Sequence, residues 1–249
     1  MTLSAWLSAG GGRLAACVQI LSRDGTRGVH AQSCMGPGES VVSVPSRLML
    51  TAGRSSVASA LDDMFGLEEA DRLIIALLYE RSLGNKSHMW PWINELPSAN
   101  ELSEGMPIFW VLQDGNDDEV RSALCCTKTA QRVRSQYAEV RARYENLVEI
   151  ATRSCNDRAI ASSGPIGSDE VVTTHRGGCS GASRDIADAA AIASLLKHTT
   201  FGDYLWAWAI LESRAIYLHS EALGAERLVL VPVNPNDASN LVCICAFVQ

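Results

Sequence analysis

The chain has 249 residues, of which 47% are hydrophobic and 20% charged, so length and composition predict a globular protein with a sizeable core. Its formal net charge of −7 and its lack of Lys/Arg runs argue against a general binder of nucleic acid or anionic membranes. No stretch of about 18 apolar residues occurs, so no membrane-spanning helix is expected. We therefore expect a soluble intracellular protein whose partners are other proteins, with cytoplasm, nucleus and plastid not distinguished.

The eight cysteines and five histidines are scattered and lack the spacing of a metal site. Neither a C-x-x-C pair nor an H-E-x-x-H motif occurs in the sequence. With no secretory signal predicted, the cysteines are expected to be free thiols in a reducing compartment. No bound metal is therefore expected.

The first 51 residues are predicted to be rich in strands. Residues 14–21 and 40–44 are short apolar runs bounded by Gly, Pro and charged residues, as buried strands tend to be. Between them, residues 36–39 (GPGE) form a strong turn signal. The pattern predicts short strands joined by tight turns.

The middle of the chain is predicted to be helical. Apolar residues recur at helical spacing over 68–83, and Gly84 with Asn85 should end this helix. A loop rich in Pro and Trp is expected at 87–110. The longest helix is expected over 117–154 and should pack on its own domain, since a coiled-coil dimer would need more than the three or so heptads seen. Its apolar stripe consists of Val120, Leu124, Val133, Tyr137, Val140, Tyr144, Leu147 and Ala151.

The last third of the chain is predicted to begin with a mobile, disordered loop at 154–184, which is rich in Ser, Gly and Asp. Helices should follow at 184–198 and 203–219, the second with Thr200 or Asp203 as its N-cap. An apolar strand is expected at 228–231. A helical block inserted into a strand-rich fold describes this order most simply, and it predicts an α+β architecture.

Short motifs follow one another in three parts of the chain. The first part holds residues 25–31 (GTRGVHA), Gly38-Glu39, Val44-Pro45 and residues 48–51 (LMLT). The second holds residues 87–93 (SHMWPWI) and 95–97 (ELP), and the third runs from Trp206 to Ser213-Arg214. In this order, over nearly the whole chain, they resemble the motifs of SET-domain methyltransferases of the plant Rubisco-lysine-methyltransferase type.

The resemblance implies a binding site for S-adenosylmethionine. In the family, the first motif cradles the methionine part of this cofactor, which assigns Gly25, Thr26, Arg27 and Gly28 to cofactor binding. The arginine of the third motif, here Arg214, would meet the methionine carboxylate through paired hydrogen bonds. In this chain the first glycine, Gly25, stands one residue away from its place in the family motif.

Each of these motifs also has a purely structural interpretation. A G-x-x-G segment is commonly a plain hairpin turn. Trp90 and Trp92 are expected to fill core space, and Trp92 stands where the family has tyrosine. Without the other motifs, Arg214 would be a surface residue that is solvated or paired with Glu212.

The chain departs from the family after residue 232. The family continues with a D-x-x-N-H motif and later a tyrosine that lines the methyl-transfer channel. Here residues 237–241 read DASNL, and no tyrosine follows Tyr217. No catalytic residue can therefore be named, and we expect a SET domain truncated before its catalytic motifs. An unspliced intron read as coding sequence is one explanation of residues 233–249.

These expectations divide the chain into four regions. They are an N-terminal SET strand region at 1–66, an inserted helical subdomain at 67–199, the start of a C-terminal SET region at 200–232, and a divergent tail at 233–249. Because the SET core would be incomplete and the tail is apolar, the chain alone is expected to be poorly soluble or marginally stable.

Two functions from different classes follow from the resemblance. The first is a protein-lysine N-methyltransferase by descent, which uses S-adenosylmethionine on a lysine of a protein substrate and is inactive if its catalytic motifs are missing. The alternative is a non-catalytic protein-interaction module derived from a SET domain, with the stripe of the long helix as its binding surface.

Overall fold

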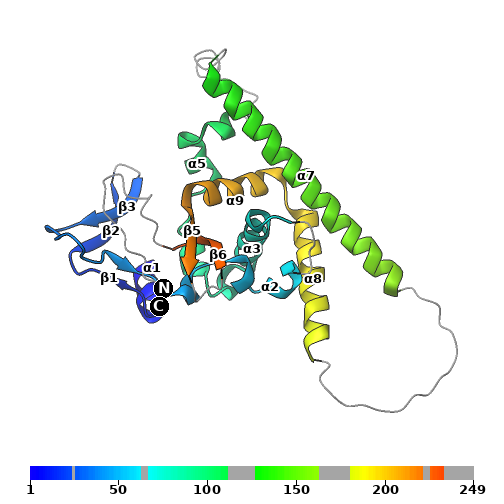
Figure 1. The fold of residues 1–249 in the computed structure, drawn as a ribbon, viewed down its shortest axis with the longest axis horizontal. Helices are drawn as coiled ribbons and strands as arrows, with labels where there is room; N and C mark the ends of the chain where they lie inside the picture. Colours follow the sequence, from blue (N-terminus) through cyan, green and yellow to red (C-terminus); the bar gives the residue numbers. More distant parts are fainter. Residues whose placement is uncertain (24–25, 63–66, 112–126, 163–179, 221–224, 233–249) are drawn as a thin grey trace. The chain divides into compact units, whose positions relative to one another are not determined.

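The chain folds into two compact units in the computed structural model, which describes residues 1–23, 26–62, 67–111, 127–162, 180–220 and 225–232. Unit 1 consists of Met1–Ser56, Glu68–Leu96 and Ala207–Gln249, and unit 2 consists of Val57–Leu67 and Pro97–Trp206. All the described strands lie in unit 1, whereas the described part of unit 2 is helical (Figure 1). The chain is therefore an α+β protein, as predicted.

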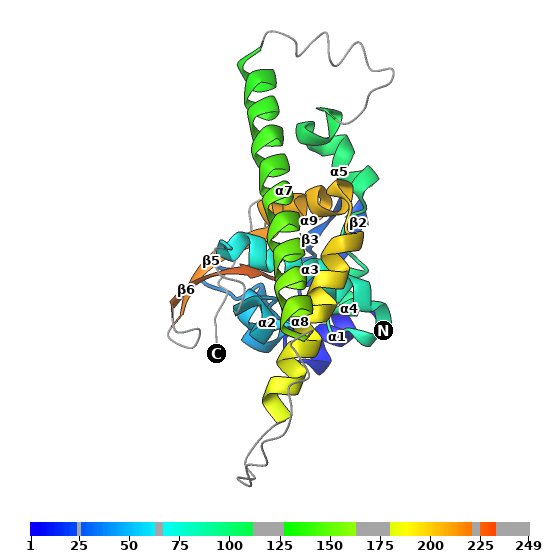
Figure 2. The same ribbon diagram turned by 90° about the vertical axis from the view of Figure 1, so that its right-hand side faces the viewer.

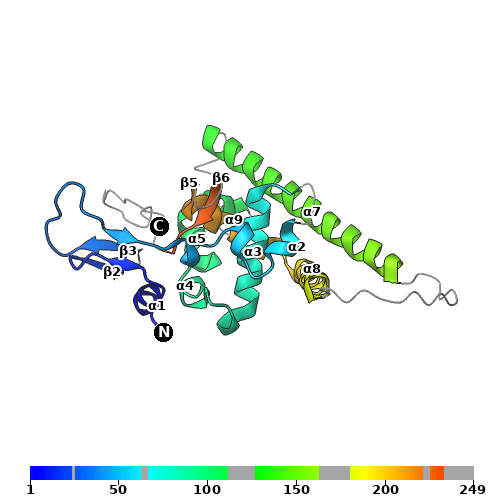
Figure 3. The ribbon, with the colours of Figure 1, turned by 60° about the horizontal axis from the view of Figure 1, so that its bottom comes forward.

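The described part of unit 1 contains three antiparallel pairs of strands. The first joins β1 (Arg13–Leu14) to β4 (Val42–Ser43). The other two, β2 (Val18–Arg23) with β3 (Thr26–Ala31) and β5 (Ala215–Ser220) with β6 (Ala225–Leu230), are labelled in Figure 3. The predicted single strand at 14–21 is wrong, because a turn in which Val18 N donates to Ala15 O at 3.0 Å divides it into β1 and β2. The predicted turn at 36–39 is confirmed, since Gly38 has φ +83° and Glu39 N donates to Gly36 O.

The helices of unit 1 are organised around α3. Unit 1 contains α1 (Leu3–Ala9), α3 (Glu69–Leu83), α4 (Trp90–Ile93), the end of α9 (Phe201–Arg214), and the 3-10 turns η1 (Ser46–Leu48), η2 (Ala52–Arg54) and η3 (Gly84–Lys86). The predicted helix at 68–83 is confirmed as α3. Its Leu73, Ile75 and Leu77 are fully buried, so α3 lies in the core of unit 1.

Gly84 ends α3 in a backbone conformation that favours glycine. Its φ is +54° and its ψ −132°, while a Cβ added there would have no atom within 4 Å. Any cost of Gly84→Ala therefore comes from the backbone, and we expect a loss of about 1–3 kcal/mol in unfolding free energy by urea titration. Gly53→Ala is the matched control, because that glycine also has open space but no positive φ. An equal loss in both variants would contradict this explanation.

Unit 2 is built around two long helices. Its described elements are α2 (Ala58–Asp62), α5 (Ala99–Gly105), the 3-10 turn η4 (Pro107–Val111), α7 (Lys128–Ser162), α8 (Ser180–His198) and the start of α9. Helices α7 and α8 lie side by side in both views (Figures 1 and 2). Val140, Leu147 and Ala151 of the predicted stripe are buried, which confirms that the long helix packs within its own domain. Val120 and Leu124 lie outside the described residues.

An aromatic cluster joins α7 to the start of α9 within unit 2. The ring centroids of Tyr137 and Tyr144 each lie 5.5 Å from that of Phe201, and the guanidinium carbon of Arg141 lies 4.8 Å from the Phe201 ring centroid. The Tyr144 hydroxyl also donates to Thr199 O at 2.9 Å. These contacts hold the first turn of α9 against α7.

Capping residues set where two helices of unit 2 begin. Thr200 Oγ1 accepts from Asp203 N at 3.2 Å, and Asp203 Oδ2 accepts from Thr200 N, so Thr200 is the N-cap of α9. Ser98 and Glu101 form the same reciprocal pair at α5. Hydrogen bonds from the backbone and then the side chain of Ser98 lower the pKa of the exposed Glu101 carboxyl from its ordinary value.

The predicted loop at 87–110 is wrong, because this segment contains α4, α5 and η4.

Two further predictions are wrong at helix ends. The predicted loop at 154–184 is too long, since α7 continues to Ser162 and α8 begins at Ser180, with 163–179 outside the described residues. The predicted helix at 203–219 ends at Arg214 instead, and β5 follows directly. Six residues of β5 pair with β6, and this tertiary pairing outweighs local helix propensity.

No helix among the described residues combines the length and apolar character needed to cross a membrane.

Candidate functional site

The first motif region of unit 1 pairs with the last described strand. Leu50, in the LMLT segment, donates its N–H to Leu230 O at 3.1 Å, and Leu230 donates back to Leu50 O at 3.0 Å. Both residues are buried, and β6 is also held by a bond from Leu228 N to Glu69 Oε1 of α3. Segments of unit 1 that the residues of unit 2 separate in the sequence thus meet in one core.

A buried carboxylate holds the start of the second motif. Glu80 of α3 is 0% exposed, and its Oε1 accepts from Ser56 N at 2.9 Å and from Ser56 Oγ at 2.5 Å. Its Oε2 accepts from the hydroxyl of Ser87, the first residue of the motif, and Ser87 Oγ in turn accepts from Met89 N. Three hydrogen bonds from neutral donors thus reach the two oxygens of this buried acid, and they offset part of the cost of its burial.

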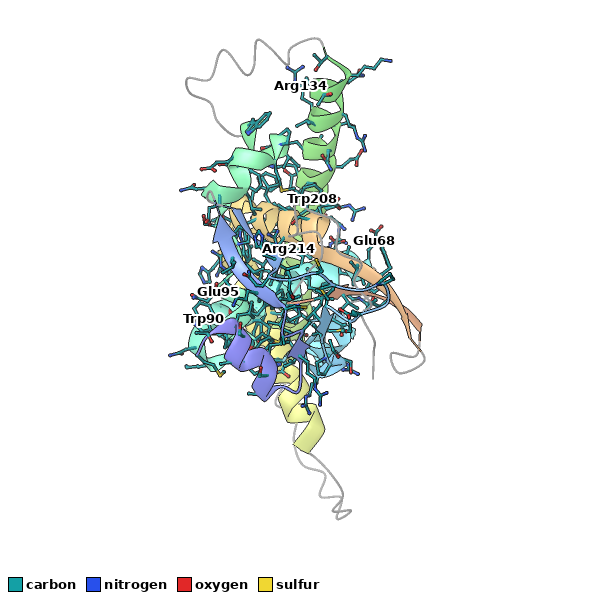
Figure 4. All side chains as sticks on the ribbon, turned by 90° about the vertical axis from the view of Figure 1, so that its left-hand side faces the viewer. Glu68, Trp90, Glu95, Arg134, Trp208 and Arg214 are labelled. Carbon is teal, nitrogen blue, oxygen red and sulfur yellow. The ribbon has the colours of Figure 1, made fainter. Side chains whose placement is uncertain are left out.

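The rest of the second motif is held by core packing and by α1. Trp6 Nε1 of α1 donates to His88 O at 2.8 Å. Met89 and Trp92 are buried, whereas Trp90, labelled in Figure 4, is half-buried. The expectation that the tryptophans fill core space is therefore confirmed for Trp92, and the motif has a clear structural role in unit 1.

The first motif lies on the β2–β3 hairpin. Gly25 lies outside the described residues, whereas Thr26, Arg27 and Gly28 are the first residues of β3 and pair with residues 21–23 of β2. Gly28 is buried opposite Leu21. This arrangement is the strand hairpin that the structural interpretation of the motif predicts, with Gly28 as a buried, paired residue of β3.

Arg214 is the last residue of α9 and is half-buried (Figure 4). Its Nη1 donates to Ser213 Oγ at 2.7 Å, and the Ser213 hydroxyl donates to Ala209 O at 2.7 Å in the preceding turn. A cation at a helix C-terminus is stabilised by the helix dipole. Gly28 and Arg214 belong to the same unit, and a pocket shared by the two stays a prediction.

Sequence reasoning missed Glu80, which is the most buried acid among the described residues of unit 1. In the sequence, the only indication of this buried acid is that Glu80 directly follows the apolar residues of α3, with serines at positions 56 and 87. Serines are too common for this pattern to be recognised without the tertiary contacts. Within the described part of the chain, no three or more His, Cys, Asp or Glu side chains gather as a metal site would require.

Comparison with known proteins does not assign the chain to a family. No protein-family model matches the chain, and no curated protein matches its sequence.

Proposed function

We propose that the chain is a SET-domain protein by descent, of the protein-lysine N-methyltransferase type, and that unit 1 binds S-adenosylmethionine. The Leu50–Leu230 pairing carries the proposal. It joins the segment that follows the Val44-Pro45 motif to the strand that follows the Ser213-Arg214 motif. In SET domains, late strands are threaded past early ones, and an inserted helical subdomain separates them in sequence.

The division of the chain supports the same proposal. Unit 2 is helical in its described part and interrupts unit 1 in the sequence, as the inserted subdomain of this family would. The packing of α7 on α8 counts against the alternative of an interaction module, because Val140, Leu147 and Ala151 are already buried within unit 2. These three residues of the apolar stripe on α7 are therefore not exposed for binding a partner protein.

Two features of unit 1 support binding of this cofactor. The Arg214 guanidinium, half-buried at a helix end, has the planar fork that binds a carboxylate through paired hydrogen bonds. Gly28, which lies beside Thr26 and Arg27 in β3, has no Cβ that would obstruct a ligand at its backbone. When bound, S-adenosylmethionine supplies the methyl group. The chain would contribute orientation and removal of the acceptor amine from water, and no residue is assigned to proton transfer.

Binding of S-adenosylhomocysteine, measured by isothermal titration calorimetry, tests the proposal. We expect the chain to bind this product and Arg214→Ala to weaken binding roughly 10- to 100-fold, as loss of a charge-assisted hydrogen-bond pair would. Arg214→Lys keeps the charge but loses the fork, so its affinity should fall between the two. Unchanged affinity in Arg214→Ala would remove the role assigned to this arginine.

Arg153→Ala is the matched control for this experiment. Arg153 lies on α7 in unit 2, its side chain is 72% exposed, and it pairs with Glu149. This variant also removes an arginine side chain but leaves the residues of unit 1 unaltered. Its affinity for S-adenosylhomocysteine should therefore equal that of the unaltered chain. Absence of any binding by the folded, unaltered chain would overturn the proposed cofactor site.

A further inference from the structure

Two cysteines flank the open end of the β2–β3 hairpin. The last strand pair at that end is Val18 with Ala31, and beyond it Gln32 N donates to Cys17 O at 2.6 Å. Cys17 therefore stands opposite Gln32, two residues before Cys34. Both thiols are free, Cys17 half-buried and Cys34 exposed.

Chain geometry limits how far apart these two cysteines can be. Facing residues of an antiparallel pair have Cα atoms about 5.5 Å apart, and two further residues span at most roughly 7.6 Å. The two Cα atoms are thus no more than roughly 13 Å apart, whereas a disulfide needs about 4.4–6.8 Å. Cys34 lies in the exposed connection between β3 and β4, where a local movement can close this gap without disturbing a strand.

We propose that Cys17 and Cys34 are a redox pair that forms a reversible disulfide across the open end of the hairpin. Glutathione disulfide or a similar small disulfide is the oxidant. The exposed Cys34 thiolate attacks one glutathione sulfur, which breaks the S–S bond, forms a mixed disulfide and releases one glutathione thiolate. The Cys17 thiolate then attacks Cys34 Sγ and releases the second glutathione. The two thiol protons go to solvent, and the two electrons go to glutathione.

The bond would regulate the hairpin that carries Thr26, Arg27 and Gly28. Closing the open end restricts separation of β2 from β3, since a disulfide limits the conformations in which the strands part. This consequence for cofactor binding rests on the function proposed above, whereas formation of the bond itself does not.

Tryptic peptide mapping under non-reducing conditions tests the pair. Cleavage after Arg13, Arg23, Arg27 and Arg47 places Cys17 in the peptide 14–23 and Cys34 in the peptide 28–47, each with one cysteine. After incubation of the full chain with glutathione disulfide and alkylation of free thiols, we expect these two peptides to be linked. Dithiothreitol should separate them again.

Cys17→Ser and Cys34→Ser are the controls, and each should abolish the linked peptide. Hydrogen exchange of the β2 and β3 amides should slow roughly tenfold or more on oxidation of the unaltered chain and stay unchanged in Cys34→Ser. Recovery of both peptides unlinked, or linkage of Cys17 or Cys34 to another cysteine, would overturn the proposal. Neither measurement uses the cofactor, so failure here is distinct from failure of the proposed function.

Discussion

Glu80→Ala is expected to lower the free energy of unfolding by about 3–5 kcal/mol, because it leaves buried donors without their acceptor and opens a cavity beside them. The Ser56 N–H and the hydroxyls of Ser56 and Ser87 all donate to this carboxylate, which is 0% exposed. Urea unfolding followed by tryptophan fluorescence measures the change. Glu80→Gln keeps the shape and one carbonyl oxygen, so it should cost less.

Two comparisons distinguish the loss of the hydrogen bonds to Glu80 from the general effect of removing an acidic side chain. Glu104→Ala removes an exposed helical acid of α5 and should change stability by no more than about 0.5 kcal/mol. Glu80→Ala combined with Ser87→Ala should cost less than the sum of the two single variants, because both remove the same hydrogen bond. Additive costs would show that the two side chains act independently.

Trp206→Ala should destabilise the protein by about 3–5 kcal/mol, as loss of a buried tryptophan usually does. Trp206 is only 3% exposed, and its Nε1 donates to Pro97 O at 2.8 Å within unit 2. Trp206→Phe retains most of the apolar contact but leaves that carbonyl without this donor, so we expect a smaller loss of about 1–3 kcal/mol. Thermal and urea unfolding measure both variants.

The half-buried Trp110 provides the comparison for Trp206. Its Nε1 makes an equivalent bond to Ser103 O at 2.7 Å, so the two residues differ mainly in burial. Trp110→Ala should therefore cost clearly less than Trp206→Ala. Equal losses would show that the hydrogen bond, and not burial, sets the contribution of these tryptophans.

Helices with strong local signals were predictable from the sequence, whereas elements that depend on distant partners were not. The apolar repeat and the glycine at 84 located α3 to within one residue. In contrast, β5 was predicted as a continuation of α9, because its pairing with β6 is not visible locally. Helix α5 is absent from the predicted elements, because it is short and lies within a segment whose Pro and Trp content favours a loop; its local signal is the Ser98–Glu101 capping box.

The same distinction applies to the candidate site. Short motifs in the sequence point to residues 25–28 and to Arg214 as candidate cofactor contacts. The sequence does not indicate that Thr26, Arg27 and Gly28 are paired residues of a strand. Nor could it indicate that Glu80 receives hydrogen bonds from serines 24 and 7 positions away. Contacts of this kind depend on how separate segments meet in the core.

Hydrogen exchange with and without S-adenosylhomocysteine tests most directly whether the β2–β3 hairpin and the end of α9 form one cofactor site. We predict that the ligand slows amide exchange in two regions of unit 1, residues 18–31 and residues 207–220, and leaves α7 in unit 2 unchanged. The protection at both regions should weaken together in Arg214→Ala. No change in either region at saturating ligand, or protection confined to unit 2, would contradict the proposed site.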